Sequence, residues 1–310
     1  MPSRITPESL LRVDDTPAGR AFYRIADLTV EVQSDLPIAD TTFSDKFRKF
    51  RVPGPGPDTI MIRHRFGIPE LAAVDLGAEV YNRQPWIVSQ AGDAWYYQMA
   101  VCDDSGNGVF DLIATDRTCR RTVNFHHDCK RYRDGNWHSL FLLPSDQFLL
   151  SRALAGRHAC YVHSAGVILS GHGLLFVGHS SAGKSTMVKM LADRVEILCD
   201  DRNIVRLHPD GFRIHGTWSH GEIPFVSSAS APLRAIFFLN KSTRNGVRPL
   251  TDPRQAFQRL LPCLIQPIVT GDWFRLSVTL LARAAAAVPC YDLDFDKSGA
   301  VVPLLEELLG

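Results

Sequence analysis

The sequence lacks several features that mark specialised classes of protein. It contains no Cys-x-x-Cys pair, and its seven cysteines are odd in number and far apart. This spacing is typical of reduced thiols rather than of a disulfide framework, so we expect a reducing compartment, the cytoplasm. No run of about 18 apolar residues is present that could cross a membrane. The opening Met-Pro-Ser-Arg-Ile-Thr-Pro-Glu-Ser also lacks the apolar core of a secretory signal.

An excess of charge of either sign is missing as well. Lys and Arg total 34 while Asp and Glu total 33, which gives a formal net charge of +1. The chain therefore has no overall field that would attract nucleic acid or an anionic membrane, and we expect neither as a partner. Because 45% of its 310 residues are hydrophobic, the chain is long enough to form two domains of ordinary size.

The first part of the chain, residues 1–144, reads as a β-rich α+β domain. Candidate strands separated by turn residues are Thr59–His64, Trp86–Ser89, Ala94–Val101, Val109–Ala114 and Thr122–Phe125, with turns at 91–93 and 103–108. Phe43, Phe47 and Phe50 have helical spacing, which predicts a short helix that buries one face in the core. We expect this domain to recognise a partner or to cover a site on the second domain.

The second part, residues 145–310, begins with a predicted helix that Ser145 caps and Gly156 ends. Strands then alternate with helices, as in an α/β nucleotide-binding core. The predicted elements are strands Cys160–Ser170, Leu174–Val177 and Val195–Leu198, helix Ser185–Leu191, a hairpin of Ile204–Leu207 with Phe212–His215, strand Ala235–Leu239, and a helical tail with one strand, Tyr291–Phe295. The apolar segment Leu280–Val288 is expected to be a buried helix.

A phosphate-binding loop lies between the second strand and its helix. Residues 178 to 185 read Gly-His-Ser-Ser-Ala-Gly-Lys-Ser, a complete Gly-x-x-x-x-Gly-Lys-Ser motif. Its amides can ring phosphate oxygens, its lysine can contact the β and γ phosphates, and its serine hydroxyl can ligand Mg²⁺. The sequence therefore predicts binding of ATP with Mg²⁺. The residues expected to bind the nucleotide are Gly178, His179, Ser180, Ser181, Ala182, Gly183, Lys184, Ser185 and Thr186.

A pair of aspartates, Asp200 and Asp201, follows the strand after the loop helix. Carboxylates at the end of a core strand face the crevice where α/β folds bind ligands, so one can hold Mg²⁺ while the other faces the reacting phosphoryl group. His163 lies on the strand before the loop strand. A single histidine on a strand is usually structural, and the residues alone do not assign it a function.

From His163 to Asp201 the chain resembles the catalytic domain of HPr kinase/phosphorylase, a bacterial serine kinase. That family has a histidine on the strand before the loop, the same loop motif, and a paired aspartate after a short helix. The resemblance implies that His163 assists the first aspartate, that Asp200 is the base toward the acceptor hydroxyl, and that Asp201 and Ser185 hold the metal. The family has a glutamate after the Lys-Ser pair, where this chain has Thr186.

The resemblance implies a kinase that transfers the γ-phosphoryl group of ATP to a hydroxyl of a peptide, a protein or a small molecule, with a serine preferred. It also leaves a homo-oligomer open. A fold of the HPr kinase and phosphoenolpyruvate carboxykinase type follows from it. A carboxykinase-like reaction and a nucleotide-binding regulatory module with little turnover are the alternative functions.

Two further segments carry polar residues near candidate strands. In Gly216-Thr217-Trp218-Ser219-His220-Gly221-Glu222, the last residue is a candidate metal or substrate ligand and His220 a candidate phosphate contact, with an ordinary surface turn as the alternative. Asn240-Lys241-Ser242-Thr243 is similar to the guanine-reading Asn-Lys-x-Asp element of GTPases. The aspartate that reads the base is replaced by Thr243, so we do not expect a GTPase.

Overall fold

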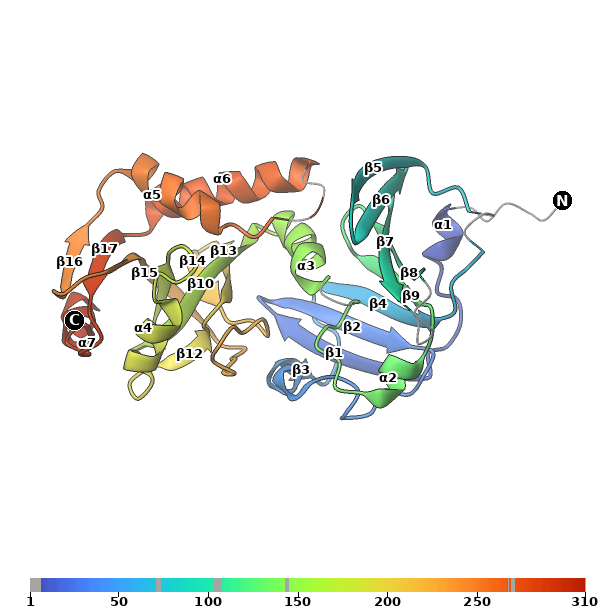
Figure 1. Cartoon of the computed structure of the whole chain (residues 1–310), viewed down its shortest axis with the longest axis horizontal. Coiled ribbons are helices and arrows are strands. Elements are labelled where there is room, and N and C mark those ends of the chain that lie inside the picture. The colour runs from blue at the N-terminus through green and yellow to red at the C-terminus, as the bar shows by residue number, and fades with distance from the viewer. Residues whose placement is uncertain are drawn as a thin grey trace. The chain divides into compact units, whose positions relative to one another are not determined.

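The computed structural model describes residues 7–70, 74–102, 108–142, 145–266, 268 and 271–309. The chain divides into two compact units, Met1–Ala153 and Leu154–Gly310 (Figure 1). The predicted boundary lay ahead of helix α3 (Asp146–Ala155), whereas the observed one lies inside this helix. The helix begins directly after Ser145 and ends before Gly156, as predicted.

Helix α3 belongs mostly to the N-terminal unit because its side chains pack there. Phe148 lies edge-on to Trp86, with ring centroids 5.1 Å apart. The buried Arg152 donates hydrogen bonds to the hydroxyl of Tyr97 (2.9 Å) and to the carbonyl of Asp116 (3.0 Å). A cut ahead of α3 would therefore expose this face of the N-terminal unit.

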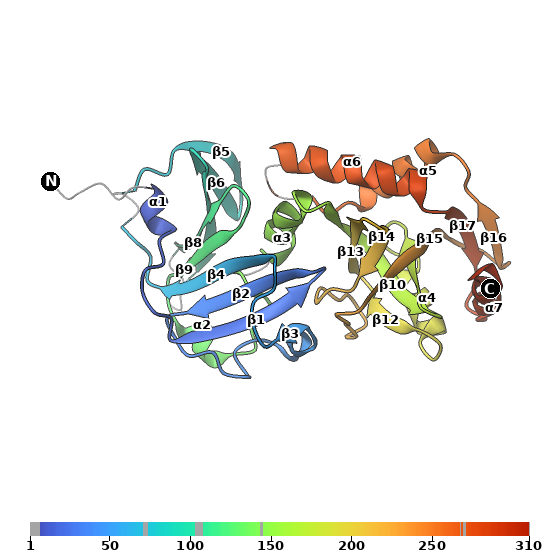
Figure 2. The same ribbon diagram turned by 180° about the vertical axis from the view of Figure 1, so that it is seen from behind.

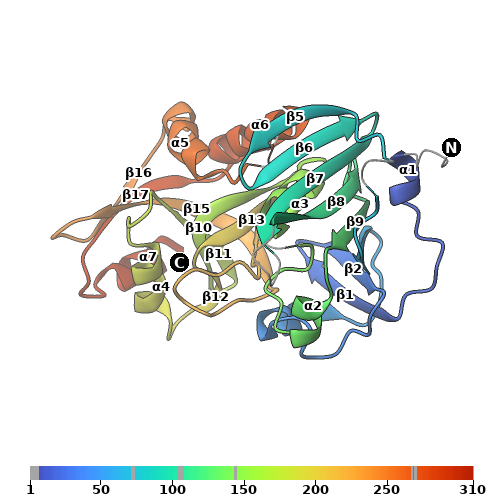
Figure 3. The same cartoon turned by 45° about the vertical axis from the view of Figure 1, so that its right-hand side comes forward.

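The N-terminal unit is built on one nine-stranded mixed sheet. In spatial order its strands are β3 (Arg51–Val52), β1 (Gly19–Ile25), β2 (Leu28–Ser34), β4 (Thr59–Phe66), β9 (Arg121–His126), β8 (Gly108–Asp116), β7 (Ala94–Cys102), β6 (Trp86–Ala91) and β5 (Ala78–Arg83). The pairs β2–β4 and β4–β9 are parallel and the others antiparallel. Figure 3 shows β5 to β9 side by side. All five predicted strands are confirmed, and β1, β2, β3 and β5 are additional.

Short helices complete this unit: α1 (Pro7–Leu10), the 3-10 helix η1 (Asp45–Phe50) and α2 (Lys130–Asp134). Phe43, Phe47 and Phe50 are all buried, as predicted, although η1 starts after Phe43. The predicted turn at 103–108 falls largely on residues 103–107, which lie outside the described part of the chain.

The C-terminal unit is built on an eight-stranded sheet. Its strands are β10 (Ala159–Leu169), β11 (His172–Val177), β12 (Glu196–Cys199), β13 (Arg202–His208), β14 (Gly211–His215), β15 (Ser230–Lys241), β16 (Gly246–Pro249) and β17 (Cys290–Phe295). The order is β11-β10-β13-β14-β15-β17-β16, with β12 paired to β10 and β11 also paired to β15. Strands β11, β15 and β17 run parallel to their neighbours in this group. The predicted strands are confirmed, and β16 is additional.

Helices cover both faces of this sheet. They are α4 (Lys184–Leu191), α5 (Pro253–Leu260), α6 (Gly271–Ala287) and α7 (Val301–Leu309), with a 3-10 turn η3 (Leu261–Cys263) after α5. Residues alternate along β11: Leu175 packs with α5 and α6, while Phe176 packs with α4 and α7. Figure 2 shows α5 and α6 on one side of the sheet. The sheet is therefore buried on both faces, which explains the continuous apolar runs of β11 and β15.

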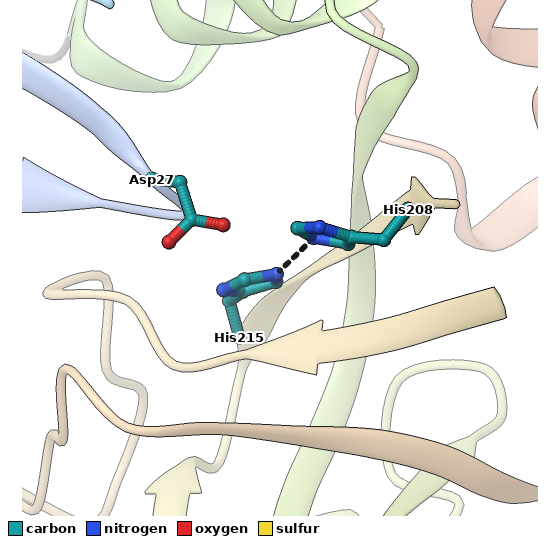
Figure 4. A group of neighbouring side chains, drawn as sticks. All are labelled: Asp27, His208 and His215. Atoms are coloured by element: carbon teal, nitrogen blue, oxygen red, sulfur yellow. Dashed lines mark hydrogen bonds between the residues drawn. The ribbon is translucent and has the colours of Figure 1, made fainter. Parts of the chain in front are cut away.

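Three smaller features complete the description. The predicted helix at Leu280–Val288 is confirmed as the end of α6, whose buried face continues to Val288 just after the helix. Among the described residues, no helix combines the length and apolar character needed to cross a membrane. The predicted hairpin is formed by β13 and β14, where His208 and His215 stack with their Nε2 atoms 3.4 Å apart (Figure 4).

Candidate functional site

The loop of residues 178–183 joins the end of β11 to the start of α4. Its two glycines are required by close contacts. A Cβ on Gly178 would lie 2.6 Å from the Cβ of Ala182. Gly183 is the N-cap of α4 with φ +102°, and its Cβ would lie 2.6 Å from the ring of Phe295. Only glycine combines that torsion with that space, so the loop holds a compact turn at the helix N-terminus.

Lys184 is folded over this loop. Its side chain is buried, and Nζ donates hydrogen bonds to the carbonyls of Gly178 (3.0 Å) and His179 (3.2 Å). Burial lowers the pKa of Lys184, although the nearby Cys263, Asp201 and Asp200 act in the opposite direction. The ammonium group therefore lies at the centre of the loop with carbonyl oxygens as its bonded partners, and phosphate oxygens could take their place.

Asp200 is tied to the loop serine and to the segment after β14. The hydroxyl of Ser185 donates to Oδ2 of Asp200 at 3.1 Å. The amide of Gly221 donates to Oδ1 at 2.7 Å, and the amide of Ile223 donates to Oδ2 at 3.0 Å. The carboxylate is buried and both of its oxygens are occupied, which fixes its position next to Ser185.

Asp201 faces a different pair of partners. Its Oδ1 lies 3.1 Å from Nε2 of His163, and its Oδ2 lies 2.5 Å from Nη1 of Arg202. Burial disfavours the charged form of Asp201, but the hydrogen bond from His163 and the charges of Arg202, His163 and Lys184 outweigh it. The net effect lowers the pKa of this carboxyl group.

These contacts correct the predicted pairings within the site. His163 contacts Asp201 and not Asp200, while Ser185 contacts Asp200 and not Asp201. Both aspartates lie in the turn between β12 and β13, and each is held by its own set of partners. His163, Ser185, Asp200 and Asp201 are brought together, but with the contacts of the two aspartates exchanged.

The backbone around the pair is held by strand β10. The amide of Ser164 donates to the carbonyl of Asp201 at 2.9 Å. The amide side chain of Asn203, which is buried, donates to the carbonyls of Ser164 (2.8 Å) and Cys199 (3.1 Å). Asn203 therefore connects the turn that contains both aspartates with β10, the strand that contains His163.

His163, Lys184, Ser185 and both aspartates line one cavity of about 350 Å³. Its lining residues are His163, Ser180, Ser181, Gly183, Lys184, Ser185, Thr186, Asp200, Asp201, Gly221, Glu222 and Lys241. Thr186 is thus part of the pocket wall. Gly178, His179 and Ala182, predicted to bind nucleotide, are in the loop but not in the lining.

The two candidates from the segment after β14 differ in position. Glu222 lines the pocket and is exposed, with its carboxylate 3.7 Å from Nζ of Lys189 on α4. An exposed ion pair at this distance contributes little stability, so the carboxylate is available to other partners. His220 is outside the lining and has its Nδ1 3.2 Å from the carbonyl of Gly221.

The sequence did not mark Lys241 as a site residue. It ends β15, the parallel neighbour of the loop strand β11, and therefore lies beside the loop as a pocket wall. Its neighbour Asn240 is turned away and donates to Asp292 (3.0 Å) and Asp294 (3.2 Å) on β17. The signal that could have found Lys241 was its place directly after an apolar strand.

The arrangement combines three chemical capacities. The amides of the loop could donate hydrogen bonds to an oligophosphate, and Lys184, which lines the pocket, could supply the compensating positive charge. Ser185 and Asp200 offer hard oxygen ligands side by side, which is the donor set that Mg²⁺ prefers. Asp201, oriented by His163 and Arg202, offers a carboxylate that can accept a hydrogen bond from a hydroxyl group.

Comparison with known proteins gives one family. Residues 139–264 match the family described as ScmC, SynChlorMet cassette protein ScmC. This span includes the loop, the aspartate pair and His163. No curated protein matches the chain.

Proposed function

We propose that this chain is a kinase that transfers the γ-phosphoryl group of ATP to a hydroxyl group. The observation that carries the proposal is the single pocket in which the Gly-x-x-x-x-Gly-Lys-Ser loop, a serine-bonded aspartate and a histidine-bonded aspartate meet. A nucleotide-binding module without turnover needs the first two groups only. The second carboxylate, oriented from two sides, favours an enzyme.

The proposed roles of the two aspartates follow their contacts. Ser185 and Asp200 would hold Mg²⁺, which when bound neutralises the β and γ phosphates. Asp201 would face the acceptor hydroxyl, with His163 and Arg202 as its positioning residues. This exchanges the roles that the resemblance implied, because each aspartate can act only on the groups it faces.

In the proposed reaction the acceptor oxygen attacks the γ-phosphorus. The bond between that phosphorus and the β,γ-bridging oxygen breaks, and ADP leaves with the electron pair. The acceptor proton passes to the carboxylate of Asp201 and then to solvent. A lowered pKa makes Asp201 a weak base, so its main contribution is to orient the hydroxyl, in keeping with a transition state that depends on placement and charge neutralisation.

The test compares Asp200→Asn with Asp201→Asn. We expect Asp201→Asn to keep its dissociation constant for Mg·ATP within about threefold of wild type, and to slow phosphoryl transfer by about 10² to 10⁴. Asp200→Asn should weaken the magnesium-dependent part of ATP affinity. Calorimetry with and without chelator measures binding. Release of ADP, with water or a serine-peptide library as acceptor, measures transfer.

The matched control is Asp210→Asn, an exposed carboxylate of the same unit in the turn between β13 and β14. It should change neither quantity. The reverse pattern, with binding lost in Asp201→Asn and kept in Asp200→Asn, would restore the roles implied by the resemblance. If the wild-type chain does not bind ATP at all, the kinase proposal is wrong.

A further inference from the structure

The pocket has two sides, which belong to the two strands that flank the loop strand β11. Strand β10 pairs with β11 antiparallel, with Ser164 opposite Val177, and β15 pairs with β11 in parallel, with Phe238 opposite Val177. His163 on β10 and the aspartate pair held to that strand lie on the first side. Lys241, at the end of β15, lies on the second side. The phosphate-binding loop lies between them.

Contacts place the end of β15 against both ends of the loop. A Cβ on Gly178, the first loop residue, would lie 3.9 Å from the carbonyl oxygen of Leu239. Lys241 pairs with Phe295 on β17, and the ring of Phe295 would lie 2.6 Å from a Cβ on Gly183, the last residue before α4. The backbone of Lys241 is therefore held next to the loop from two directions.

The side chain of Lys241 lies on the face of the sheet that α4 covers. Side chains alternate between the two faces along a strand. Leu239 packs in the core cluster that contains the apolar residues of α4, while Asn240 donates hydrogen bonds to Asp292 and Asp294 on β17. Lys241, two residues after Leu239, is therefore on the α4 face, in agreement with its place in the pocket lining.

The ammonium group of Lys241 has no competing partner in the described part of the chain. The residue is exposed, and no hydrogen bond or ion pair of its side chain is present among the described residues. In contrast, Lys184 is buried and donates to two loop carbonyls, and each aspartate of the pair is held by its own donors. An exposed ammonium group at the pocket wall can contact an anionic ligand without breaking a bond within the protein.

The two sides of the pocket set the direction in which a nucleotide can bind. In the proposed reaction the γ-phosphorus lies next to the acceptor hydroxyl, and this hydroxyl faces Asp201 on the β10 side. Neighbouring strands are about 4.8 Å apart, so β10 and β15 are roughly 10 Å apart across β11. A single phosphate group cannot bridge that width, whereas the phosphate chain of a nucleotide can extend over the loop from one side to the other. Its nucleoside end then reaches β15.

We infer that Lys241 binds the α-phosphate of the nucleotide, and that the nucleoside extends over the end of β15. A lysine suits this position, since its compact ammonium group contacts a phosphate as a point charge and its flexible stem can reach from the pocket wall. Lys184 and Mg²⁺ would neutralise the β and γ phosphates, which leaves the α-phosphate to Lys241. ADP keeps this phosphate, so the same contact holds the product. This inference rests on the proposed kinase function.

The test measures the affinities of Lys241→Ala for Mg·ATP and Mg·ADP by calorimetry. Because both ligands carry the α-phosphate, both dissociation constants should rise about fivefold, the upper range for a contact with an exposed charge. Lys241→Arg keeps the charge and should bind both nucleotides within about twofold of wild type. Lys297→Ala removes an exposed lysine of the same unit outside the pocket lining and should bind both as wild type does. Thermal unfolding should be unchanged in all three variants, since both lysines are exposed.

An affinity of Lys241→Ala that falls for ATP and stays at the wild-type value for ADP would assign Lys241 to the γ-phosphate and overturn the inference. Unchanged affinity for both nucleotides would overturn it as well. Either result would leave the kinase proposal standing, because that proposal depends on the loop and on the aspartates of the β10 side. A wild-type chain that binds neither nucleotide would remove the proposed function, and the inference with it.

Discussion

Arg63 in the N-terminal unit and Lys184 in the C-terminal unit are both buried cations, 1% and 7% exposed, but their partners differ. Arg63 donates from Nε to Asp35 (2.8 Å) and from Nη2 to Asp15 (3.1 Å), so carboxylates neutralise it within the unit. Lys184 donates only to carbonyls of its own loop among its described hydrogen bonds. Removing a buried cation that is paired with carboxylates leaves those carboxylates uncompensated, whereas the proposed function needs a cation, such as Lys184, whose charge is free for an anionic ligand.

The histidines of the two units show the same contrast. In the N-terminal unit, Nε2 of His64 donates to the carbonyl of Leu140 (3.0 Å), so its Nδ1 accepts from Nε2 of His126 (2.9 Å). Both rings are buried among aromatic side chains. In the C-terminal unit, His163 is partly exposed in the pocket wall beside Asp201. The first pair lies in the interior of its unit, and the second lines the pocket where the proposed function needs contact with a ligand.

The largest effect expected from this contrast is on the stability of the N-terminal unit. Arg63→Met leaves the carboxylates of Asp15 and Asp35 without their shared cation, which should cost roughly 2 to 4 kcal/mol of unfolding free energy, because both are partly exposed and regain some hydration. Hydrogen exchange of peptides from each unit should locate the loss in the N-terminal unit. ATP affinity should not change.

Arg20→Met is the control for Arg63→Met, since it removes an exposed ion pair with Glu31 (3.1 Å) and should cost less than about 1 kcal/mol. Equal losses of unfolding free energy in the two variants would show that the buried cluster around Arg63 contributes no more than an exposed ion pair. A fall in ATP affinity in Arg63→Met would contradict the assignment of Arg63 to stability and of Lys184 to ligand binding.

Acid should also act on the N-terminal unit first. Burial lowers the pKa of His64 to about 4, and burial together with the charges of His64 and His127 lowers the pKa of His126 well below 6.5. Below pH 6.5 the unfolded chain binds these protons and the folded unit does not, so stability falls as pH drops from 6.5 toward 4. The slope should approach about 1.4 kcal/mol per pH unit for each histidine.

Denaturant unfolding between pH 7 and 4.5 measures that slope, with exchange by unit as the readout. His64→Gln combined with His126→Gln should be less stable at pH 7 but should lose the histidine part of the slope. The same steepness in this double variant would mean that other groups control acid sensitivity.

Lys184→Ala should change ligand binding and leave both units folded. The lysine is the cation expected to contact the β and γ phosphates, so its loss should weaken ATP binding at least tenfold, about 1.4 kcal/mol or more. Lys189→Ala, on the same helix and exposed, is the matched control and should bind as wild type. Unchanged calorimetric affinity in Lys184→Ala would remove the distinction drawn between the two buried cations.

Local patterns predicted most of the elements, and they could not predict how those elements pair. A strand at Thr59–His64 was predicted and is part of β4 (Thr59–Phe66), but its parallel partners β2 and β9 are set by contacts far along the chain. Strand Gly19–Ile25 was missed, although its buried residues Ala21, Tyr23 and Ile25 alternate with the exposed Arg20 and Arg24. Pairing depends on packing between distant segments, which a single sequence does not display.

The site shows the same limit. The loop motif and its neighbouring residues were predicted because each has its own spacing or residue type. The direction of Asp200 and Asp201 was not, since both lie in the turn between β12 and β13. That turn is held by hydrogen bonds from Ser164, which is distant in sequence, and from Asn203. Lys241 was missed because the neighbourhood of β11 and β15 is a tertiary feature.

The smallest effects are expected from substitutions at two glycines, one in each unit, where an added Cβ would make close contacts. A Cβ on Gly221 would lie 3.0 Å from the Cβ of Asp201 and 3.2 Å from Oδ2 of Asp200, so the aspartate pair must shift by a few tenths of an ångström. A Cβ on Gly19 would lie 2.7 Å from Cγ1 of Ile38 and 2.9 Å from the carbonyl oxygen of Leu36, inside the N-terminal unit. Both substitutions crowd their surroundings, but only the first crowds groups assigned to chemistry.

We therefore expect Gly221→Ala to slow phosphoryl transfer several-fold to about tenfold while ATP affinity stays within about threefold, because small displacements of reacting groups affect rate more than binding. Gly19→Ala should do the opposite, lowering unfolding free energy by about 1 to 3 kcal/mol with normal transfer by the folded protein. Gly246→Ala meets no atom within 4 Å and should change neither. Thermal unfolding and steady-state transfer on all three variants decide the matter. If Gly221→Ala lowers the unfolding free energy and the transfer rate in the same proportion as Gly19→Ala, Gly221 contributes only to folding, and the backbone next to the aspartates has no separate role in positioning them.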